Sequence, residues 1–273
     1  MQARYAPAYS SDHTFLGAVR RGADGAPGQA ARFAVAGVPF DGAVTNRPGA
    51  RFGPGAIRAA SRMLCDATHP LYDCSPRDAL IDVGDLQLPA TSLLAIVHLD
   101  AHCDAWSDHF GERSGHGTWM REAIQERLVI PEATVQIGIR SPAASETREF
   151  VQRAGGSVID ARELRGRDNP QQLADVIDGV RARAGRDRPP VYLTLDIDCL
   201  DPAFAPGTGT PEAGGLSTVQ VLTLLEELAE LNWVGMDCVE VAPAYDHADI
   251  TSLAAATFVW TYLCGRIASA PSP

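Results

Sequence analysis

The sequence contains no lysine, so all 23 of its basic residues are arginines. A chain without lysine has no Walker-type phosphate lysine, no lysine that can form a Schiff base, and no attachment point for pyridoxal phosphate. These three kinds of enzyme chemistry are therefore excluded.

Paired cysteines and long apolar runs are also missing. The six cysteines include no CxxC spacing, which would have indicated a zinc site or a redox dithiol. No stretch is long and apolar enough to span a bilayer, and residues 1–12 lack the apolar core of a signal peptide. We therefore expect reduced thiols, no membrane association and a cytoplasmic protein.

Basic charge is scarce relative to acidic charge. The chain has 34 acidic and 23 basic residues and a formal net charge of -11, which argues against nucleic acid as a partner and weakly favours a cationic ligand. Its 273 residues suit one large α/β domain or two small ones. We favour a single domain over residues 1–273, with an amino-terminal extension over 1–30 and a frayed tail over 268–273.

Apolar runs alternate with helical patterns along the chain, which predicts a mainly parallel sheet covered by helices on both faces. Functional groups are then expected at the carboxyl ends of the strands. The expected helices lie near 56–64 and 170–184 and begin near 118, 145, 217 and 251, with Thr118 and Ser217 as N-caps. The expected strands are 33–38, 79–83, 94–99, 134–139, 157–159, 191–195 and 233–241.

One connection does not suit this pattern. Parallel neighbouring strands need a crossover of a dozen or more residues, but only about nine residues separate Asp85 from Ala95, and Pro89 lies among them. Either strands 79–83 and 94–99 are antiparallel, or they are not adjacent, or a helical crossover is missing.

Two acidic clusters follow buried strands. Asp100, His102 and Asp104 come after one strand, and Asp196 and Asp198 come after another. Alternate side chains of an extended segment share one face, so each cluster can converge. Gathering so many carboxylates at buried strand ends is costly unless cations neutralise them. We interpret the clusters as metal ligands; the alternative is a set of caps and turn carboxylates at ordinary loop starts.

The chemistry of this donor set favours Mn²⁺. It consists of carboxylate oxygens and one imidazole, whereas Cys103 and Cys199 alternate with these residues and should point away. A water bound to such a cation is acidic enough to supply hydroxide near neutral pH.

Several longer strings carry a family resemblance. VHLDAHCDAW, SGHGTW, YLTLDIDCLDPAFAPGTGTPEAGGLS and VGMDCVEVAPAYDHADITSLAAAT resemble the signature blocks of the ureohydrolase (arginase and agmatinase) family, and those of its agmatinase branch most closely. GVPFDGAVTNRPGARFGPGAIR resembles the first loop and helix of that family. The resemblance implies a three-layer α/β/α, arginase-like fold, a trimeric or hexameric assembly, and a binuclear manganese site that hydrolyses a guanidino group to urea and an amine.

The same resemblance implies roles for the clustered residues. Asp100 and Asp196 would bridge two Mn²⁺ ions. His102 and Asp198 would bind one of them, and Asp104 would bind the other.

Three residues have catalytic roles by the same resemblance. Asp104 would orient the attacking water, His116 would carry a proton to the leaving amine, and Glu240 would hold the guanidinium. Without the resemblance, a solvated loop histidine is an equally good interpretation of His116. The corresponding alternative for Glu240 is an ordinary ion pair with an arginine.

The chain also departs from the family pattern. Family members carry a GGDH block just before the DAHxD strand, and its histidine binds the same metal as Asp104; this sequence has no such block. The short connection from Asp85 to Ala95 is where the block should lie. The loss of one segment therefore accounts for both the missing crossover and the missing ligand. His98 is the nearest remaining histidine and shares a face with Asp100, but it lies deeper in the strand, so we expect a packed core residue.

The resemblance of the signature blocks to the agmatinase branch implies agmatine as the substrate. The far end of agmatine is a second cation, whereas arginine would need donors for its carboxylate; guanidinobutyrate would suit Arg47 better. Asn46, Arg47, Asp246 and Asp249 could line the entrance, but no contact is assigned to them.

Three other interpretations remain open. They are a single-metal deacetylase, a non-catalytic ureohydrolase-like subunit, and a truncated copy of a working enzyme.

Overall fold

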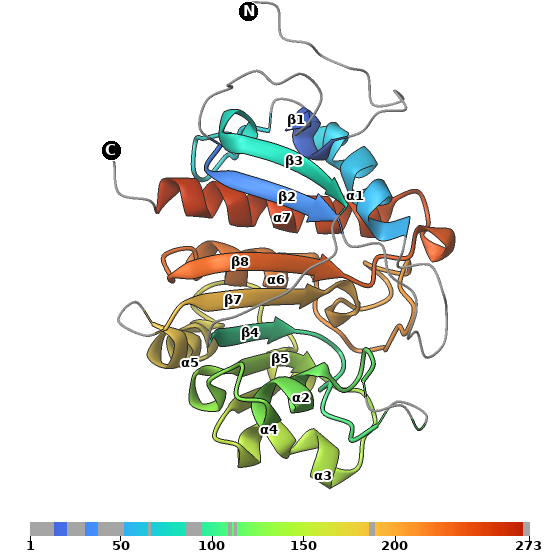
Figure 1. Cartoon of the computed structure of the whole chain (residues 1–273), viewed down its shortest axis with the longest axis vertical. Coiled ribbons are helices and arrows are strands. Elements are labelled where there is room, and N and C mark those ends of the chain that lie inside the picture. Colours follow the sequence, from blue (N-terminus) through green and yellow to red (C-terminus); the bar gives the residue numbers. More distant parts are fainter. Residues whose placement is uncertain are drawn as a thin grey trace, which may run out of the picture.

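The computed structural model describes residues 14–20, 31–37, 52–64, 67–85, 94–108, 111, 114–185 and 189–269. Within these residues every strand pairing is parallel, as predicted. The strands form two sheets, in the orders β1-β3-β2 and β6-β5-β4-β7-β8 (Figure 1). Their bounds are β1 Val19–Arg20, β2 Phe33–Gly37, β3 Leu80–Asp85, β4 Ala95–Leu99, β5 Val135–Ile139, β6 Ser157–Asp160, β7 Val191–Asp196 and β8 Trp233–Val239.

The two strands on either side of the short connection belong to different sheets. β3 lies in the three-stranded sheet and β4 in the five-stranded sheet, so they are not adjacent. Of the three alternatives, non-adjacency is therefore the one that the structure has. Residues 86–93 lie outside the described part of the chain.

β4 forms the centre of the larger sheet. All five of its residues are buried, and so are all five of β5, which fits their nearly continuous apolar sequences. Ala95, Val97 and Leu99 belong to the core cluster that includes the buried faces of α5 and α6. Ile96 points the other way, into a cluster with residues of α2 and α4. Helices thus cover both faces of this sheet, which is the three-layer α/β/α arrangement that was predicted.

The long carboxy-terminal helix α7 joins the two sheets (Figure 1). Its Phe258 packs into the core of the five-stranded sheet, whereas Ala256 and Leu263 pack with Leu80 of β3. The helices are α1 Gly53–Ser61, α2 Trp119–Gln125, α3 Ser145–Arg148, α4 Phe150–Arg153, α5 Ala174–Ala184, α6 Thr218–Glu227 and α7 Ile250–Ala268. The 3-10 turns are η1 Phe15–Gly17, η3 Arg62–Leu64, η4 Arg77–Ala79, η5 Pro131–Ala133, η6 Ala161–Leu164, η7 Ile197–Cys199 and η8 Pro243–Tyr245.

The two predicted N-caps have different outcomes. Ser217 caps α6 with a complete capping box, in which its side chain accepts from the backbone N–H of Gln220 and the Gln220 side chain accepts from the backbone N–H of Ser217. Thr118 occupies the N-cap position of α2, but its side chain makes no cap hydrogen bond. Its hydroxyl contacts Glu122 and Gly115 instead, so the side-chain cap predicted there is wrong.

Within the described residues, no helix has both the length and the apolar character needed to cross a membrane.

Candidate metal centre

The carboxyl ends of β4 and β7 carry the two acidic clusters. β4 ends at Leu99, so Asp100, His102 and Asp104 lie in the loop that follows it. Asp196 is the last residue of β7, and Asp198 lies in the 3-10 turn η7. The two strands are direct neighbours in register, from Ala95 beside Val191 to Leu99 beside Leu195, and this pairing brings the clusters together.

The convergence was predicted, but its expected cause was wrong. Strand alternation does not extend through the first cluster, because the strand has ended before Asp100. Asp104 has a φ of 50°, a left-handed conformation that is uncommon for residues other than glycine. The loop itself therefore turns the Asp104 carboxylate toward the other residues.

One group of possible ligand atoms joins Asp100, His102 and Asp198, whose donor atoms lie within 4.8 Å of one another. His102 Nδ1 is 3.2 Å from Asp100 Oδ1 and 3.1 Å from Asp198 Oδ2. Asp100 and Asp198 are buried, and His102 is partly exposed.

A second group joins His98, Asp100 and Asp104 within the same limit. His98 Nε2 lies 2.7 Å from Asp100 Oδ2 and 3.9 Å from Asp104 Oδ2. Asp100 belongs to both groups. His98 is buried, as expected of a core residue, but its ring reaches the acidic cluster.

Asp196 belongs to neither of these two groups of ligand atoms. It is buried at the end of β7, and its Oδ1 accepts a hydrogen bond of 2.8 Å from the backbone N–H of Asp198. Its predicted role as a second bridging ligand stays a prediction.

The electrostatics show how unfavourable these carboxylates are without a cation. Burial raises the pKa of Asp104, Asp196 and Asp198, and repulsion from neighbouring carboxylates raises each of them further. Burial also acts to lower the pKa of His102, but its hydrogen bonds to Asp100 and Asp198 raise that pKa to about 11. Burial opposes ionisation of Asp100 as well, yet the two neighbouring imidazoles hold its pKa below the usual range. Positive charge is therefore strongly favoured at this position.

The donor set fits Mn²⁺ or a similar hard cation. The groups contribute carboxylate oxygens and imidazole nitrogens, which are the ligands of such ions. The cysteines within the clusters do not contribute, because Cys103 packs with Ala105 and Ile139 and Cys199 packs in the main core.

His116 and Glu240 meet at the same end of the sheet. His116 Nδ1 lies 2.6 Å from Glu240 Oε1, and both side chains are partly exposed. Glu240 follows β8 directly and has a φ of 62°, so it too adopts an uncommon left-handed conformation. An imidazole beside a carboxylate at the rim of a charged cluster is suited to proton transfer.

Several neighbours of the cluster were not identified from the sequence. Trp119 Nε1 donates a hydrogen bond of 2.6 Å to Asp104 Oδ2, and Glu212 Oε1 lies 4.0 Å from His102 Nε2. Gln136 is buried on β5, and its Nε2 lies 2.9 Å from His98 Nδ1. A signal for Gln136 was available, because it is a polar residue inside an apolar strand. Trp119 lies in the SGHGTW block, but no role was assigned to it.

The residues expected near the entrance divide into two sets. Asn46 and Arg47 lie outside the described residues. Asp246 accepts hydrogen bonds from the backbone N–H groups of Thr251 and Ser252 in the first turn of α7, and Asp249 is the N-cap residue of that helix. Asp246 therefore stabilises the start of α7.

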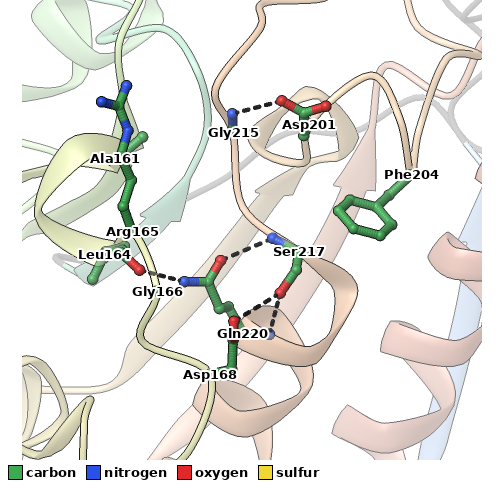
Figure 2. Close-up of a pocket in the computed structure, with 10 residues that line it drawn as sticks. All are labelled: Ala161, Leu164, Arg165, Gly166, Asp168, Asp201, Phe204, Gly215, Ser217 and Gln220. Carbon is green, nitrogen blue, oxygen red and sulfur yellow. Dashed lines mark hydrogen bonds between the residues drawn. The ribbon is translucent and has the colours of Figure 1, made fainter.

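A pocket of about 230 Å³ lies beside the amino-terminal end of α6 (Figure 2). It is lined in part by Arg165, Phe204 and Gln220 and by no residue of the acidic clusters. Gln220 Nε2 donates to the carbonyl groups of Leu164 and Arg167, so this side chain is used to join the preceding loop to α6.

A parallel α/β sheet that carries clustered Asp and His residues at the carboxyl ends of its strands is the arrangement expected of a metal-dependent hydrolase. The family model described as Arginase family matches this chain over residues 31–94 and again over residues 90–265. The chain belongs to the arginase family. The fold of this family is known for binuclear metal sites, which agrees with the two groups of Asp and His donors.

The relatives support this assignment in sequence and in structure. The agmatinase of Cronobacter sakazakii is 39% identical over 274 aligned residues, which cover 83% of this chain and 85% of that protein. The structure of proclavaminate amidino hydrolase from Streptomyces clavuligerus has a TM-score of 0.83 and 33% identity, and the match covers 97% of this chain and 100% of that chain. A hypothetical agmatinase from Burkholderia thailandensis has a TM-score of 0.77 and 32% identity, with 95% and 92% of the two chains covered.

Proposed function

We propose that this chain hydrolyses the guanidino group of a small cationic compound, with agmatine as the substrate and urea and putrescine as the products. The observation that carries the proposal is the convergence of Asp100, His102, Asp104 and Asp198 on one sheet edge that His116 and Glu240 also occupy. Sequence identity to proteins named agmatinase supports the choice of substrate.

Asp100, His102, Asp104, Asp196 and Asp198 would hold two Mn²⁺ ions. Bound there, the ions would lower the pKa of a water molecule and polarise the guanidinium. No other group among the described residues has a comparable set of buried donors.

The remaining steps belong to side chains of this chain. The Glu240 carboxylate would accept hydrogen bonds from two guanidinium N–H groups and so fix the orientation of the substrate. Asp104 would orient the attacking water toward the guanidinium carbon. The C–N bond to the alkyl amine then breaks, and His116 would deliver the proton that the leaving nitrogen takes up. One water is consumed, and one urea and one alkylammonium ion are formed.

A substrate comparison tests this proposal. Urea release is measured with Mn²⁺-loaded protein and agmatine, arginine or guanidinobutyrate in parallel. We expect agmatine to be hydrolysed fastest, and His116→Ala to lower kcat by about 10²–10⁴-fold, the usual contribution of a general acid. His247→Ala is the matched control, since His247 is an exposed histidine outside the cluster. Urea from none of the three compounds contradicts the proposal.

A second candidate is a catalytically impaired, ureohydrolase-like subunit. The family match consists of two pieces that meet at residues 90–94. The alignment with the agmatinase relative has 274 positions but covers only 83% of this chain, so some aligned positions have no counterpart in this chain. This chain therefore lacks positions that the relative has, and the two pieces of the family match meet where the GGDH histidine is expected. Binding of one Mn²⁺ per chain without urea release would favour this candidate.

We also propose that the protein works in the cytoplasm as a homo-oligomer, a trimer or hexamer, in polyamine synthesis. Light scattering on the purified chain tests the assembly, and a monomer at micromolar concentration would contradict it.

A further inference from the structure

His98 lies directly behind Asp100, on the side of β4 that faces α2. Its Nε2 is 2.7 Å from Asp100 Oδ2, and both residues are buried. Its ring packs against the Trp119 indole in a T-shaped arrangement, with centroids 5.1 Å apart. Two roles are compatible with this position: Nε2 can carry a lone pair and bind a metal beside Asp104, or it can carry a hydrogen and donate it to Asp100. The other ring nitrogen decides between them.

Gln136 faces that other nitrogen. It is the register partner of His98 across β4 and β5, and its Nε2 lies 2.9 Å from His98 Nδ1 and 2.8 Å from the carbonyl oxygen of Cys103. A carbonyl oxygen only accepts hydrogen bonds, so the amide must direct its NH₂ group toward Cys103. The second hydrogen of that NH₂ group then points at His98 Nδ1.

The unsatisfied oxygen of Gln136 supports this orientation. Among the described residues, Gln136 Oε1 is buried without a hydrogen-bond partner. Rotating the amide by half a turn would place Oε1 against the Cys103 carbonyl, so that two acceptors would face each other at hydrogen-bond distance. The amide thus keeps the orientation in which it donates twice, although this leaves one acceptor unpaired.

We propose that Gln136 and His98 are a positioning pair for Asp100. Gln136 donates to Nδ1 and thereby fixes the hydrogen of the neutral imidazole on Nε2, and His98 donates that hydrogen to Asp100 Oδ2. Asp100 Oδ1 is held in turn by the backbone N–H of His102 at 2.6 Å. Both oxygens of the carboxylate are therefore oriented from the protein side.

The position of this hydrogen decides whether His98 can replace the GGDH histidine, the metal ligand that the chain lacks. With a hydrogen on Nε2, His98 has no lone pair on the nitrogen that faces Asp104, so it does not replace the GGDH histidine. It acts through Asp100 as a partner of a metal-binding residue. This inference rests on the proposed metal-binding role of Asp100 and deepens it.

The first test determines directly which ring nitrogen of His98 carries the hydrogen. Long-range ¹H–¹⁵N spectra are recorded on the metal-free, full-length chain labelled with ¹⁵N-histidine, and His98→Gln identifies the signals of His98. We expect one hydrogen on Nε2 and none on Nδ1, and the Nε2 hydrogen remains when diamagnetic Cd²⁺ is added. Hydrogen on Nδ1, or loss of the Nε2 hydrogen with Cd²⁺, would overturn the proposal and make His98 a ligand.

The second test substitutes Gln136 or His98 and measures the affinity of the chain for Mn²⁺. Gln136→Glu presents an acceptor to Nδ1, so we expect the hydrogen of His98 to move there and the Mn²⁺ affinity to fall by about 10–100-fold. Gln152→Glu, the same change at an exposed position of α4, should leave the affinity unchanged. His98→Leu should weaken Mn²⁺ binding similarly, and His98→Gln, which retains an N–H donor, should restore most of it.

The outcomes separate this inference from the proposed function. Unchanged Mn²⁺ affinity in Gln136→Glu and His98→Leu overturns the positioning pair, while a wild-type chain that binds no Mn²⁺ contradicts the proposed function. In the latter case, or if a variant fails to fold, the spectrum of the metal-free wild-type chain still decides the position of the hydrogen.

Discussion

One tryptophan helps to orient the Asp104 carboxylate. The Trp119 indole donates a hydrogen bond of 2.6 Å to Asp104 Oδ2 and packs on His98. We expect Trp119→Phe to preserve the packing but to lose the donor, and to weaken Mn²⁺ binding by about 10-fold. Trp233→Phe is the control, because Trp233 donates to the Leu228 carbonyl far from the cluster. Equal Mn²⁺ affinities of the two variants would show that the indole does not orient Asp104.

His102 predicts a pH dependence of metal binding. Its hydrogen bonds to Asp100 and Asp198 raise its pKa to about 11, so the metal-free chain holds it protonated at neutral pH. A metal binds only the neutral imidazole, so binding must release about one proton from His102, and the affinity should rise with pH over the neutral range. Calorimetry in buffers of different ionisation enthalpy measures this release. A binding enthalpy that is the same in every buffer would contradict it.

At the residue scale, the sequence predicted which side chains lie close together, but it did not predict the loop geometry that brings them together. The order of residues after the two strands was enough to bring Asp100, His102 and Asp198 into one group. The left-handed conformation of Asp104 could not be read from the sequence, because loop geometry depends on contacts that the loop makes elsewhere. The contact of Trp119 with Asp104 could not be predicted for the same reason, although Trp119 lies in the SGHGTW block.

At the element scale, a buried ion pair joins α1 to β3. Arg58 donates to both carboxylate oxygens of Asp82, at 2.8 and 3.0 Å, and both residues are buried. Removing one partner of such a pair leaves an uncompensated charge, so Arg58→Met should lower the free energy of unfolding by about 3–5 kcal/mol. Denaturant unfolding at neutral pH measures this loss, and a change below about 1 kcal/mol would show that the pair is dispensable.

The same pair predicts a loss of stability in acid. Burial acts to raise the pKa of Asp82, but hydrogen bonds from Arg58 and from the backbone of Phe15 hold it below the usual value. A carboxylate with a lowered folded-state pKa contributes stability that is present above its unfolded pKa and lost as pH falls through the folded pKa. Asp82→Asn should therefore reduce the dependence of stability on pH below about pH 4, the ordinary aspartate pKa. A variant with the acid dependence of the wild type would exclude this contribution.

Local elements were predictable where their causes are local. The predicted Ser217 cap forms, and it does so within a capping box with Gln220, three positions further along the chain. The helix expected over 170–184 begins only at Ala174, and the segment from Ser145 forms two short helices, α3 and α4. The separation of β3 from β4 could be stated only as one of three alternatives, since strand partners are fixed by distant parts of the chain.

At the scale of the whole molecule, the division of the sheet and the break in the family match occur at the same place. The two matched pieces meet at residues 90–94, between β3 of the smaller sheet and β4 of the larger sheet. Helix α7 packs on both sheets and connects their cores. The five predicted ligands all lie at or just after the carboxyl ends of β4 and β7, two strands of the larger sheet, so the smaller sheet supplies none of them.

The most direct test of the account is the number of Mn²⁺ ions bound per chain, measured by elemental analysis and followed in the same sample by urea release from agmatine. We predict that the chain binds two Mn²⁺ ions at the Asp and His groups and forms urea. His102→Ala and Asp196→Ala should lose both Mn²⁺ binding and urea release. A chain that binds no Mn²⁺ and forms no urea, or variants that retain full turnover, would contradict the central claim that this edge of the sheet is a metal-dependent catalytic centre.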